Sequence, residues 1–265
     1  NEIYGAWPAS IMVGGVDRDG NPMFNELSEL FIEAIETTGL VNPSVAVCYT
    51  EDMPDYLLEK CVDIIAKGYT RPSIFNDRVI QQGLLDAGVD ERDARYYIHS
   101  TCVEITPIAS SNIMVATPYI NLNKAFEYIL GGGKQLFGDW CHVERDIAFS
   151  LDKLVSFEDF KELSQKIAAE IIRTDLTKTC HYLYAREKYT SSPLASDFID
   201  DCIKMGKDAV AGGAKYHYIY PCFPGFVNLV DSLSAVKKAV YEEKVLTLGE
   251  LSELCKNNFA NGEEL

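Results

Sequence analysis

The sequence of 265 residues predicts an α/β protein built on a parallel sheet, with a barrel as the favoured arrangement. Two observations predict this class. Short β-prone runs alternate with amphipathic helical segments through the first part of the chain, and the connections between them are short, which is the pattern of parallel α/β architecture. The later part of the chain carries mainly helical periodicity, so a more helical second half is expected.

The first expected elements are a strand and a capped helix. The run SIMVGGV at 10–16 is apolar and ends in two glycines before a polar turn, which indicates a strand entering a loop. Asn25 can cap a helix over 26–37, and Gly39 can end it. The side chains expected on the buried face of this helix are Leu27, Leu30, Phe31 and Ala34.

The remaining elements follow from the same patterns. Apolar β-prone runs predict further strands at 44–49, 73–75 and 96–103. Helical periodicity between glycine and proline signals predicts helices at 54–67, 77–87, 119–130, 157–174, 194–210, 231–244 and 248–258. The apolar stripe expected on the longest of these consists of Phe160, Leu163, Ile167, Ala168, Ile171 and Ile172. The segment 105–118 is expected to be an irregular loop.

Composition excludes several classes of protein. Lys and Arg number 24 and Asp and Glu 40, a net charge of −16, which argues against binding nucleic acid because phosphate contacts need a basic face. No apolar run reaches the roughly 18 residues of a membrane span, and no signal peptide is evident. The eight cysteines are scattered without any CxxC pair, so neither a disulfide framework nor a metal site is expected. These features indicate a soluble, cytoplasmic protein.

The segment from Ser100 to Glu104 carries the sharpest chemical signal. Cys102 and Glu104 are two residues apart, which places both side chains on one face of a strand. A neighbouring carboxylate disfavours a thiolate, so the pair suits hydrogen-atom transfer by a neutral thiol better than ionic nucleophilic attack. Two alternatives stay open: a buried cysteine beside a structural glutamate, and a thiolate–imidazolium pair of Cys102 with His99, which needs a bend in the strand.

A series of short segments carries a family likeness in order along nearly the whole chain. They are Gly14–Gly20, Asn25–Ser28, Asn42–Ser44, Ile74–Asp77, Asp93–Tyr96, Cys102–Glu104, Ser192–Leu194, Cys202–Asp208, Gly212–Tyr216 and Asp231–Lys238. Their order and spacing resemble those of glycyl radical enzymes. This is the pyruvate formate-lyase-like group, which includes glycerol, propanediol and choline lyases and arylacetate decarboxylases.

The resemblance implies a ten-stranded α/β barrel, of which this chain would be the central portion. It implies that Cys102 becomes a thiyl that takes hydrogen from a small organic substrate, while Glu104 transfers a proton. The cofactor would be a glycyl radical, installed by a separate activase that uses S-adenosylmethionine and an iron–sulfur cluster. The chain itself would then bind no metal, and the full-length protein would be a homodimer acting as a lyase, dehydratase or decarboxylase.

The sequence departs from the family pattern in ways that shape these expectations. Thr101 stands where the family commonly has glycine, so a remodelled pocket beside Cys102 is expected, and Thr101, Ser110 and Asn112 are candidate substrate-binding residues. Ser110 and Asn112 could equally satisfy the backbone of their loop. Ala116 falls about where the dehydratases and the choline lyase carry an aspartate, which disfavours a diol dehydratase.

The RVSGY-like glycine segment of the family is not found in this sequence. The expected organisation is therefore one incomplete domain over 1–265, with barrel strands, helices and the catalytic loop in 1–130 and a mainly helical continuation in 131–265. The alternative function is that of a truncated or radical-free homologue, which folds and binds or assembles without radical catalysis.

Overall fold

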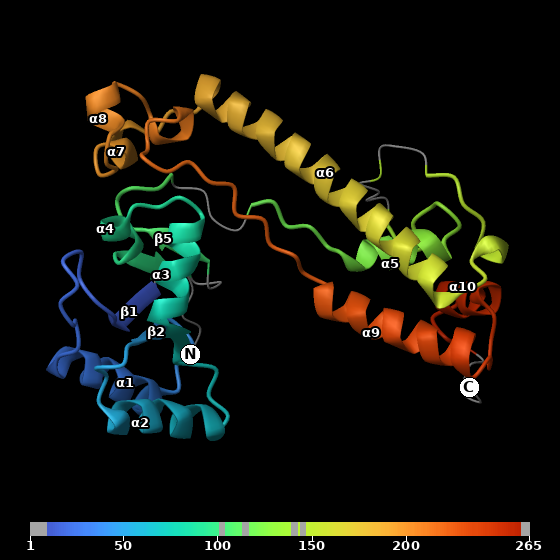
Figure 1. Ribbon diagram of the computed structural model, residues 1–265, viewed down its shortest axis with the longest axis horizontal. Helices are drawn as coiled ribbons and strands as arrows, with labels where there is room; N and C mark the ends of the chain where they lie inside the picture. The colour runs from blue at the N-terminus through green and yellow to red at the C-terminus, as the bar shows by residue number, and fades with distance from the viewer. Residues whose placement is uncertain (1–9, 101–103, 113–116, 139–142, 144–146, 261–265) are drawn as a thin grey trace. The chain divides into compact units, whose positions relative to one another are not determined.

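The computed structural model describes residues 10–100, 104–112, 117–138, 143 and 147–260. Their contacts divide the chain into two compact units, each assembled from two stretches of sequence. The first unit comprises Asn1–Val115 and Tyr189–Tyr218, and the second comprises Ala116–Lys188 and Ile219–Leu265. The colour gradient of Figure 1 shows how the chain leaves the first unit and later returns to it. Each unit is described separately.

The first unit is built on a parallel sheet, as the sequence predicts. Its strands lie in the order β1 (Ser10–Gly14), β2 (Ser44–Tyr49) and β3 (Ser73–Asn76), and both pairs run parallel. The helices that connect and extend them are α1 (Glu26–Thr38), α2 (Asp55–Ala66), α3 (Asp77–Asp86) and the short α4 (Glu91–Ala94). The central strand β2 is almost wholly buried, which explains its uninterrupted apolar sequence. The α/β class is confirmed, and within the described residues this sheet is open.

Helix α1 begins at the expected cap but buries a different face. The side chain of Asn25 accepts hydrogen bonds from the backbone amides of Leu27 and Ser28, and Gly39 ends the helix in the left-handed conformation. Leu27 and Leu30 are more than half exposed, however, while Ile32 and Ile35 are buried against the sheet side of the unit. The helix therefore has one apolar stripe with Leu27 and Leu30 and another with Ile32 and Ile35. Its periodicity allows either stripe to be buried, and its packing on the sheet determines which one is.

An antiparallel hairpin follows α4 and is the element that the sequence analysis placed least well. Strand β4 (Tyr97–His99) pairs with β5 (Ile105–Pro107), with His99 opposite Ile105. The sequence predicted one longer strand at 96–103 and a loop from residue 105. The loop prediction is wrong at 105–107, where β5 lies. A strand of three residues is too short to show a period in the sequence, and its hydrogen bonds come from the facing strand β4.

The second unit is helical. Its elements are α5 (Asn123–Leu130), the 3₁₀ turn η1 (Leu151–Lys153), α6 (Phe157–Tyr189), α9 (Phe226–Val236), the π-helical turn η3 (Lys237–Glu242) and α10 (Leu248–Lys256). Their apolar side chains share one core, in which Phe160 and Ile167 of α6 are fully buried. The stripe predicted for α6 is confirmed, although the helix continues from Thr174 to Tyr189.

The continuous helix expected at 194–210 is wrong. That stretch contains α7 (Pro193–Ser196), α8 (Cys202–Met205) and the turn η2 (Ala209–Ala211). Asp201 and Gly206 take left-handed backbone conformations, with φ of 71° and 61°, which interrupt any α-helix at those positions. Two other predicted starts are displaced: the helix expected from 119 begins at Asn123, and the one expected from 231 begins at Phe226.

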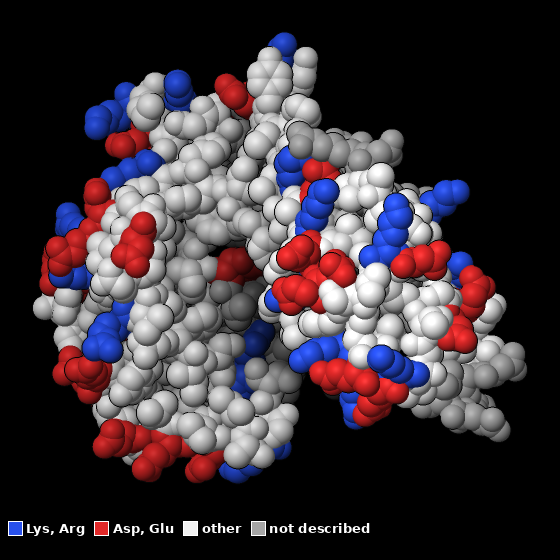
Figure 2. All heavy atoms as spheres, turned by 45° about the vertical axis from the view of Figure 1, so that its right-hand side comes forward, with Lys and Arg blue, Asp and Glu red and all other residues white. Residues whose placement is uncertain are grey.

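The surface carries charged side chains of both signs (Figure 2). Figure 2 shows Asp and Glu side chains interspersed with Lys and Arg over the described residues of the face in view. This mixture agrees with the acid excess of the sequence. In the described part of the chain, no helix is long and apolar enough to cross a bilayer.

Candidate functional site

The two residues that flank the segment containing the predicted catalytic cysteine, Ser100 and Glu104, are hydrogen-bonded to each other. Beyond the paired strands, the backbone amide of Ser100 donates to the carbonyl of Glu104 at 2.7 Å, and the Ser100 hydroxyl donates to the Glu104 carboxylate. Cys102 and Thr101 belong to the three residues that join Ser100 to Glu104, and they lie outside the described residues. The structure therefore brings Ser100 and Glu104 together, and Glu104 is half-buried there.

Ser110 and Asn112, the other two predicted binding residues, are buried on the segment that follows β5. The Ser110 hydroxyl donates to the carbonyl of Ile108 at 3.3 Å. The Asn112 amide donates to the carbonyl of Tyr218 at 2.9 Å, and its side-chain oxygen accepts from the amide of Tyr218 at 3.0 Å. These contacts serve the backbone, as the structural alternative expects. They tie the segment after β5 to the returning chain at 216–218.

A buried cluster beneath β4 was missed by the sequence reasoning. We call Cys48, Asp77 and Tyr97 the anchor cluster. The Tyr97 hydroxyl lies 2.8 Å from Cys48 Sγ and donates to Asp77 Oδ1 at 2.9 Å, and all three residues are at most 6% exposed. Burial raises the pKa of the Cys48 thiol to about 12 and also raises the pKa of Tyr97. Both groups therefore stay protonated at neutral pH.

His99, the other inward-facing residue of β4, is in a state that disfavours the thiolate alternative. It is fully buried, and its ring lies against Phe75 with the centroids 5.4 Å apart. Burial, and secondarily the positive charge of Arg71, lower the pKa of His99. A thiolate–imidazolium pair needs this ring to be charged, whereas its surroundings favour the neutral form.

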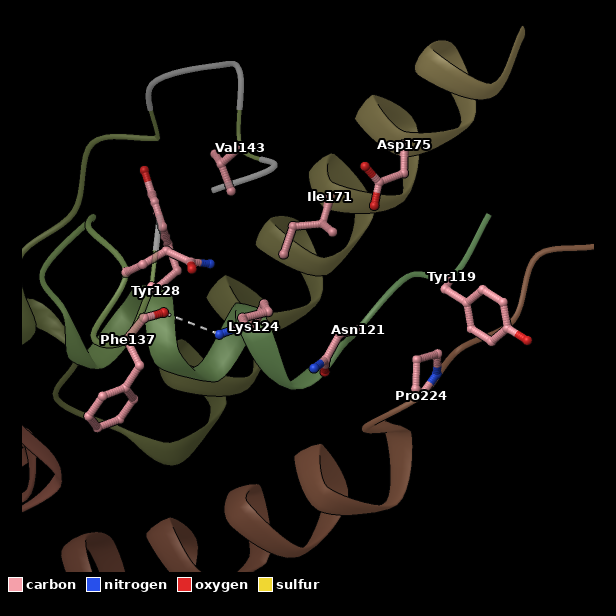
Figure 3. Close-up of a pocket in the computed structure, with 11 residues that line it drawn as sticks. Tyr119, Asn121, Lys124, Tyr128, Phe137, Val143, Ile171, Asp175 and Pro224 are labelled. Carbon is pink, nitrogen blue, oxygen red and sulfur yellow. Dashed lines mark hydrogen bonds between the residues drawn. The ribbon is translucent and has the colours of Figure 1, made fainter. Parts of the chain in front are cut away.

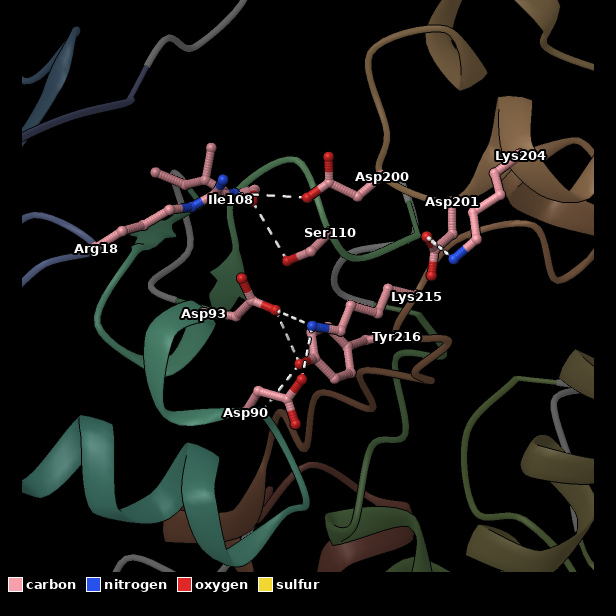
Figure 4. A network of polar contacts seen from close by, with 10 residues as sticks. All are labelled: Arg18, Asp90, Asp93, Ile108, Ser110, Asp200, Asp201, Lys204, Lys215 and Tyr216. Atoms are coloured by element: carbon pink, nitrogen blue, oxygen red, sulfur yellow. Dashed lines mark hydrogen bonds and ion pairs between the residues drawn. The ribbon is translucent and has the colours of Figure 1, made fainter.

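A second polar arrangement, shown in Figure 4, secures the segments on both sides of the hairpin. We call Asp90, Asp93, Lys215 and Tyr216 the lysine network. The Lys215 ammonium lies 2.7 Å from Asp90 and 2.6 Å from Asp93, and the Tyr216 hydroxyl donates to Asp93 at 2.9 Å. Hydrogen bonds to Asp90 and Asp93 raise the pKa of Lys215. The network joins α4, just before β4, to a segment more than 120 residues later.

Arg18 braces the other stem of the hairpin. Its guanidinium donates to the carbonyl of Ile108 at 3.4 Å and lies 3.6 Å from Asp200 (Figure 4). The guanidinium also lies over the Tyr96 ring, 4.9 Å from the ring centroid. Arg18 belongs to the loop after β1, so the region around the first predicted motif contacts the hairpin directly. No local sequence signal distinguishes Arg18 from the other surface arginines.

Each of the two units contains a cavity. A cavity of about 190 Å³ in the first unit lies at the carboxyl ends of β1 and β2 and is lined by Gly14, Gly15, Cys48, Asp77 and Tyr97 among others. A cavity of about 300 Å³ in the second unit is mainly apolar, with Lys124 and Asp175 as its charged lining residues (Figure 3). Across the described residues, no three His, Cys, Asp or Glu side chains gather in a way that could hold a metal ion.

The fold and site together define a class: an α/β protein in which a parallel sheet supports a hairpin closed by a serine and a glutamate around a cysteine-containing segment. Comparison with known proteins gives the family. The Pyruvate formate lyase-like family matches residues 3–265, so the chain belongs to that family. The homologues include glycyl radical enzymes, as the sequence motifs predict.

Among its relatives, (2S)-3-sulfopropanediol dehydratase of Klebsiella oxytoca is 31% identical over 97% of this chain and 31% of its own length. The solved structure of hydroxyproline dehydratase from Clostridioides difficile, with trans-4-hydroxy-L-proline bound, matches with a TM-score of 0.81 and 29% identity. The glycerol-bound B12-independent glycerol dehydratase from Clostridium butyricum matches with a TM-score of 0.78 and 27% identity. Each structural match covers 96% of this chain and 32% of the other, so the chain spans about a third of these relatives' length.

Proposed function

We propose that this chain is the central segment of a glycyl radical enzyme of the lyase, dehydratase or decarboxylase type, with Cys102 and Glu104 as its reacting residues. The observation that carries the proposal is the pair of hydrogen bonds between Ser100 and Glu104, which flank Cys102 in sequence, in a chain that belongs to the pyruvate formate lyase-like family over 3–265. The segment would form part of a ten-stranded barrel in the complete, cytoplasmic protein.

The residues of this chain fit the chemistry of a neutral thiol. Glu104 is held by Ser100 two residues from Cys102 in sequence, and a carboxylate so near favours S–H over thiolate. The glycyl radical of the family would supply the unpaired electron, and Cys102 would give up its thiol hydrogen atom to it. Cys102 then takes a hydrogen atom from a C–H bond of the substrate and regains its S–H bond.

Glu104 moves the proton that accompanies departure of the substrate's leaving group. The Cys102 thiol finally returns a hydrogen atom to the product radical and becomes a thiyl again, and its S–H bond would be restored by hydrogen from the C–H bond of the family's glycine. The half-buried position of Glu104 and its hydrogen bond from Ser100 keep the carboxylate oriented for this transfer. The substrate class we propose is a small hydroxylated organic molecule, as in the names of the three relatives above.

Two partners complete the proposal. An activase using S-adenosylmethionine and an iron–sulfur cluster would install the radical, and the full-length protein would be a homodimer. The proposal includes Thr101, Ser110 and Asn112 as substrate-binding residues, and Ser110 and Asn112 also hydrogen-bond to backbone carbonyls.

The test uses the complete protein, activated anaerobically and examined by electron paramagnetic resonance and by turnover of sulfopropanediol, hydroxyproline and glycerol. We expect a glycyl doublet in the wild type. Cys102→Ser should keep the doublet and lose turnover by a factor of at least about 10³, since the serine O–H bond is too strong to replace the thiol. Glu104→Ala should also lose product formation.

The matched control is Cys180→Ser, because Cys180 is an exposed cysteine of α6 in the second unit. It should keep both the doublet and turnover. Turnover by Cys102→Ser at the wild-type rate would overturn the proposal. So would a wild-type protein that carries no doublet after activation, which is the behaviour of a radical-free homologue.

A further inference from the structure

The residues of β4 alternate in a way that directs two side chains toward the parallel sheet. Tyr97 and His99 are buried and Ile98 between them is not, as expected for a strand with one face on the core. Tyr97 is joined through the anchor cluster to Cys48 of β2 and to Asp77, the first residue of α3 after β3. The hairpin is therefore hydrogen-bonded through a side chain to the carboxyl ends of two sheet strands.

The proton positions in the anchor cluster follow from the donors available. The Tyr97 hydroxyl donates to Asp77 Oδ1 at 2.9 Å, and the Cys48 thiol donates to the same oxygen at 3.3 Å. Burial keeps that thiol protonated at neutral pH. Cys48 and Tyr97, whose sulfur and oxygen atoms lie 2.8 Å apart, thus both depend on Asp77, and this shared acceptor ties β4 to the carboxyl ends of β2 and β3.

We propose that Tyr97 is a positioning residue for the reaction, holding the hairpin through Cys48 and Asp77 so that Cys102 and Glu104 meet the substrate at reactive distance. The inference rests on the proposed function of Cys102 and Glu104. Tyr97 acts through β4, the strand that precedes Cys102 and Glu104 in the hairpin.

The expected size of the effect follows from geometry. Tyr97 lies five residues before Cys102, and β4 is paired with β5, so a shift of β4 on the sheet carries both stems of the hairpin with it. A misplacement of about 1 Å costs on the order of 10²-fold in rate when atoms must transfer over a short distance. Loss of the Tyr97 hydroxyl should therefore lower kcat without changing substrate binding to the same extent.

The experiment compares Tyr97→Phe with Tyr69→Phe in the complete, activated protein. Tyr69 is a partly buried tyrosine of the same unit whose hydroxyl donates to the carbonyl of Glu36 at 3.4 Å, away from the hairpin. Tyr97→Phe is expected to lower kcat by about 10- to 100-fold, with KM within about 3-fold and a normal glycyl doublet. Tyr69→Phe is expected to change neither kcat nor the doublet.

A second pair of variants tests the donor role of Cys48. Cys48→Ser keeps a donor for Asp77 beside the Tyr97 hydroxyl and should retain most of kcat, whereas Cys48→Ala removes the donor and should approach the loss seen in Tyr97→Phe. A wild-type kcat in Tyr97→Phe overturns the inference, as does a Cys48→Ser no better than Cys48→Ala. If Cys102→Ser loses turnover while Tyr97→Phe keeps it, the proposed function stands and only the positioning role fails.

Discussion

Burial determines the protonation of Cys48, which lies beneath the hairpin, and of His99, which belongs to it. Cys48 and His99 lie at similar depth, and in both cases burial opposes the charged form, so the thiol stays protonated and the imidazole stays neutral. In the sequence, Cys48 belongs to an apolar run and His99 is an isolated histidine, so no local pattern indicates the protonation state of either. Their states depend on partners 20 or more residues away, such as Asp77 and Tyr97 for Cys48.

The neutral state of His99 predicts a pH dependence of stability. Its pKa in the folded protein is below the ordinary 6.5, so on acidification the unfolded chain takes up a proton before the folded one does. The contribution of His99 to the free energy of unfolding is constant above about pH 6.5. It falls as the pH drops below that value, by at most about 1.4 kcal/mol per pH unit. Thermal unfolding of the wild type should therefore shift to lower temperature between pH 7.5 and 5.5.

The measurement is the difference in that shift between the wild type and His99→Gln in the complete protein. Other carboxylates and histidines titrate in both proteins and cancel in the comparison. His99→Gln should show the smaller shift. An equal shift in both would mean that His99 takes up its proton as readily in the folded state as in the unfolded chain.

At the same scale, the sequence predicted the pair Cys102 and Glu104 but not the residues that support it. The spacing of two in an extended segment is a local property, and so is readable. The Ser100 hydrogen bond depends on the turn that reverses the chain, and the anchor cluster depends on sheet order. Arg18 and Lys215 contact the hairpin stems from segments about 90 and 120 residues away, which leaves no local pattern.

Among the elements, those with strong end signals were predicted well. Asn25, Gly39 and the glycines after α2 and α3 set boundaries that the structure confirms within a residue or two. The run at 194–210 was predicted wrongly because its apolar residues suit a helical period, while its backbone turns at Asp201 and Gly206. Such turns depend on tertiary contacts, among them the hydrogen bond from the amide of Asp200 to the carbonyl of Ala109.

Gly14, the last residue of β1, shows how closely the first elements pack. Its φ is +80°, and a Cβ atom there would lie 2.2 Å from the Phe24 ring and 2.8 Å from the carbonyl of Cys48. Gly14→Ala should destabilise the protein by about 2–4 kcal/mol, since overpacking adds to the cost of the left-handed conformation. The loss should show as a lower unfolding temperature and a lower soluble yield.

The control for Gly14→Ala is Gly68→Ala. Gly68 also has a positive φ, of +91°, but no atom lies within 4 Å of its Cβ position. It should lose only about 1–2 kcal/mol, from backbone strain alone. Equal losses in the two variants would show that the Phe24 ring moves aside without cost.

Over the whole chain, each unit combines two separated stretches of sequence. In the first unit the lysine network connects 90–93 to 215–216, while Asn112 connects to Tyr218. Asp93 is nearly buried, so its charge depends on these partners. The return of the segment at 215–218 to the first unit was not predicted from the sequence, because a contact across more than 100 residues leaves no local pattern.

Lys215→Met tests that connection. It removes the cation between Asp90 and Asp93 and leaves the buried Asp93 carboxylate with the Tyr216 hydroxyl alone from the network, which should cost about 1–3 kcal/mol. The matched control is Lys238→Met, whose ion pair with Glu243 spans 3.6 Å on the surface and should be worth less than about 1 kcal/mol. Circular dichroism during thermal unfolding gives both values, and equal values would contradict the role of the network.

The interrupted path of the first unit has a consequence for synthesis on the ribosome. After Asn112 emerges, about 100 further residues, including all of α6, must be translated before Lys215 and Tyr218 exist. At roughly 5–20 residues per second, that interval lasts about 5–20 s. The nascent sheet can form during it, but Asp93 and Asn112 lack the partners that Lys215, Tyr216 and Tyr218 later provide. The support of the hairpin stems is therefore completed late, after the sheet on which the hairpin rests.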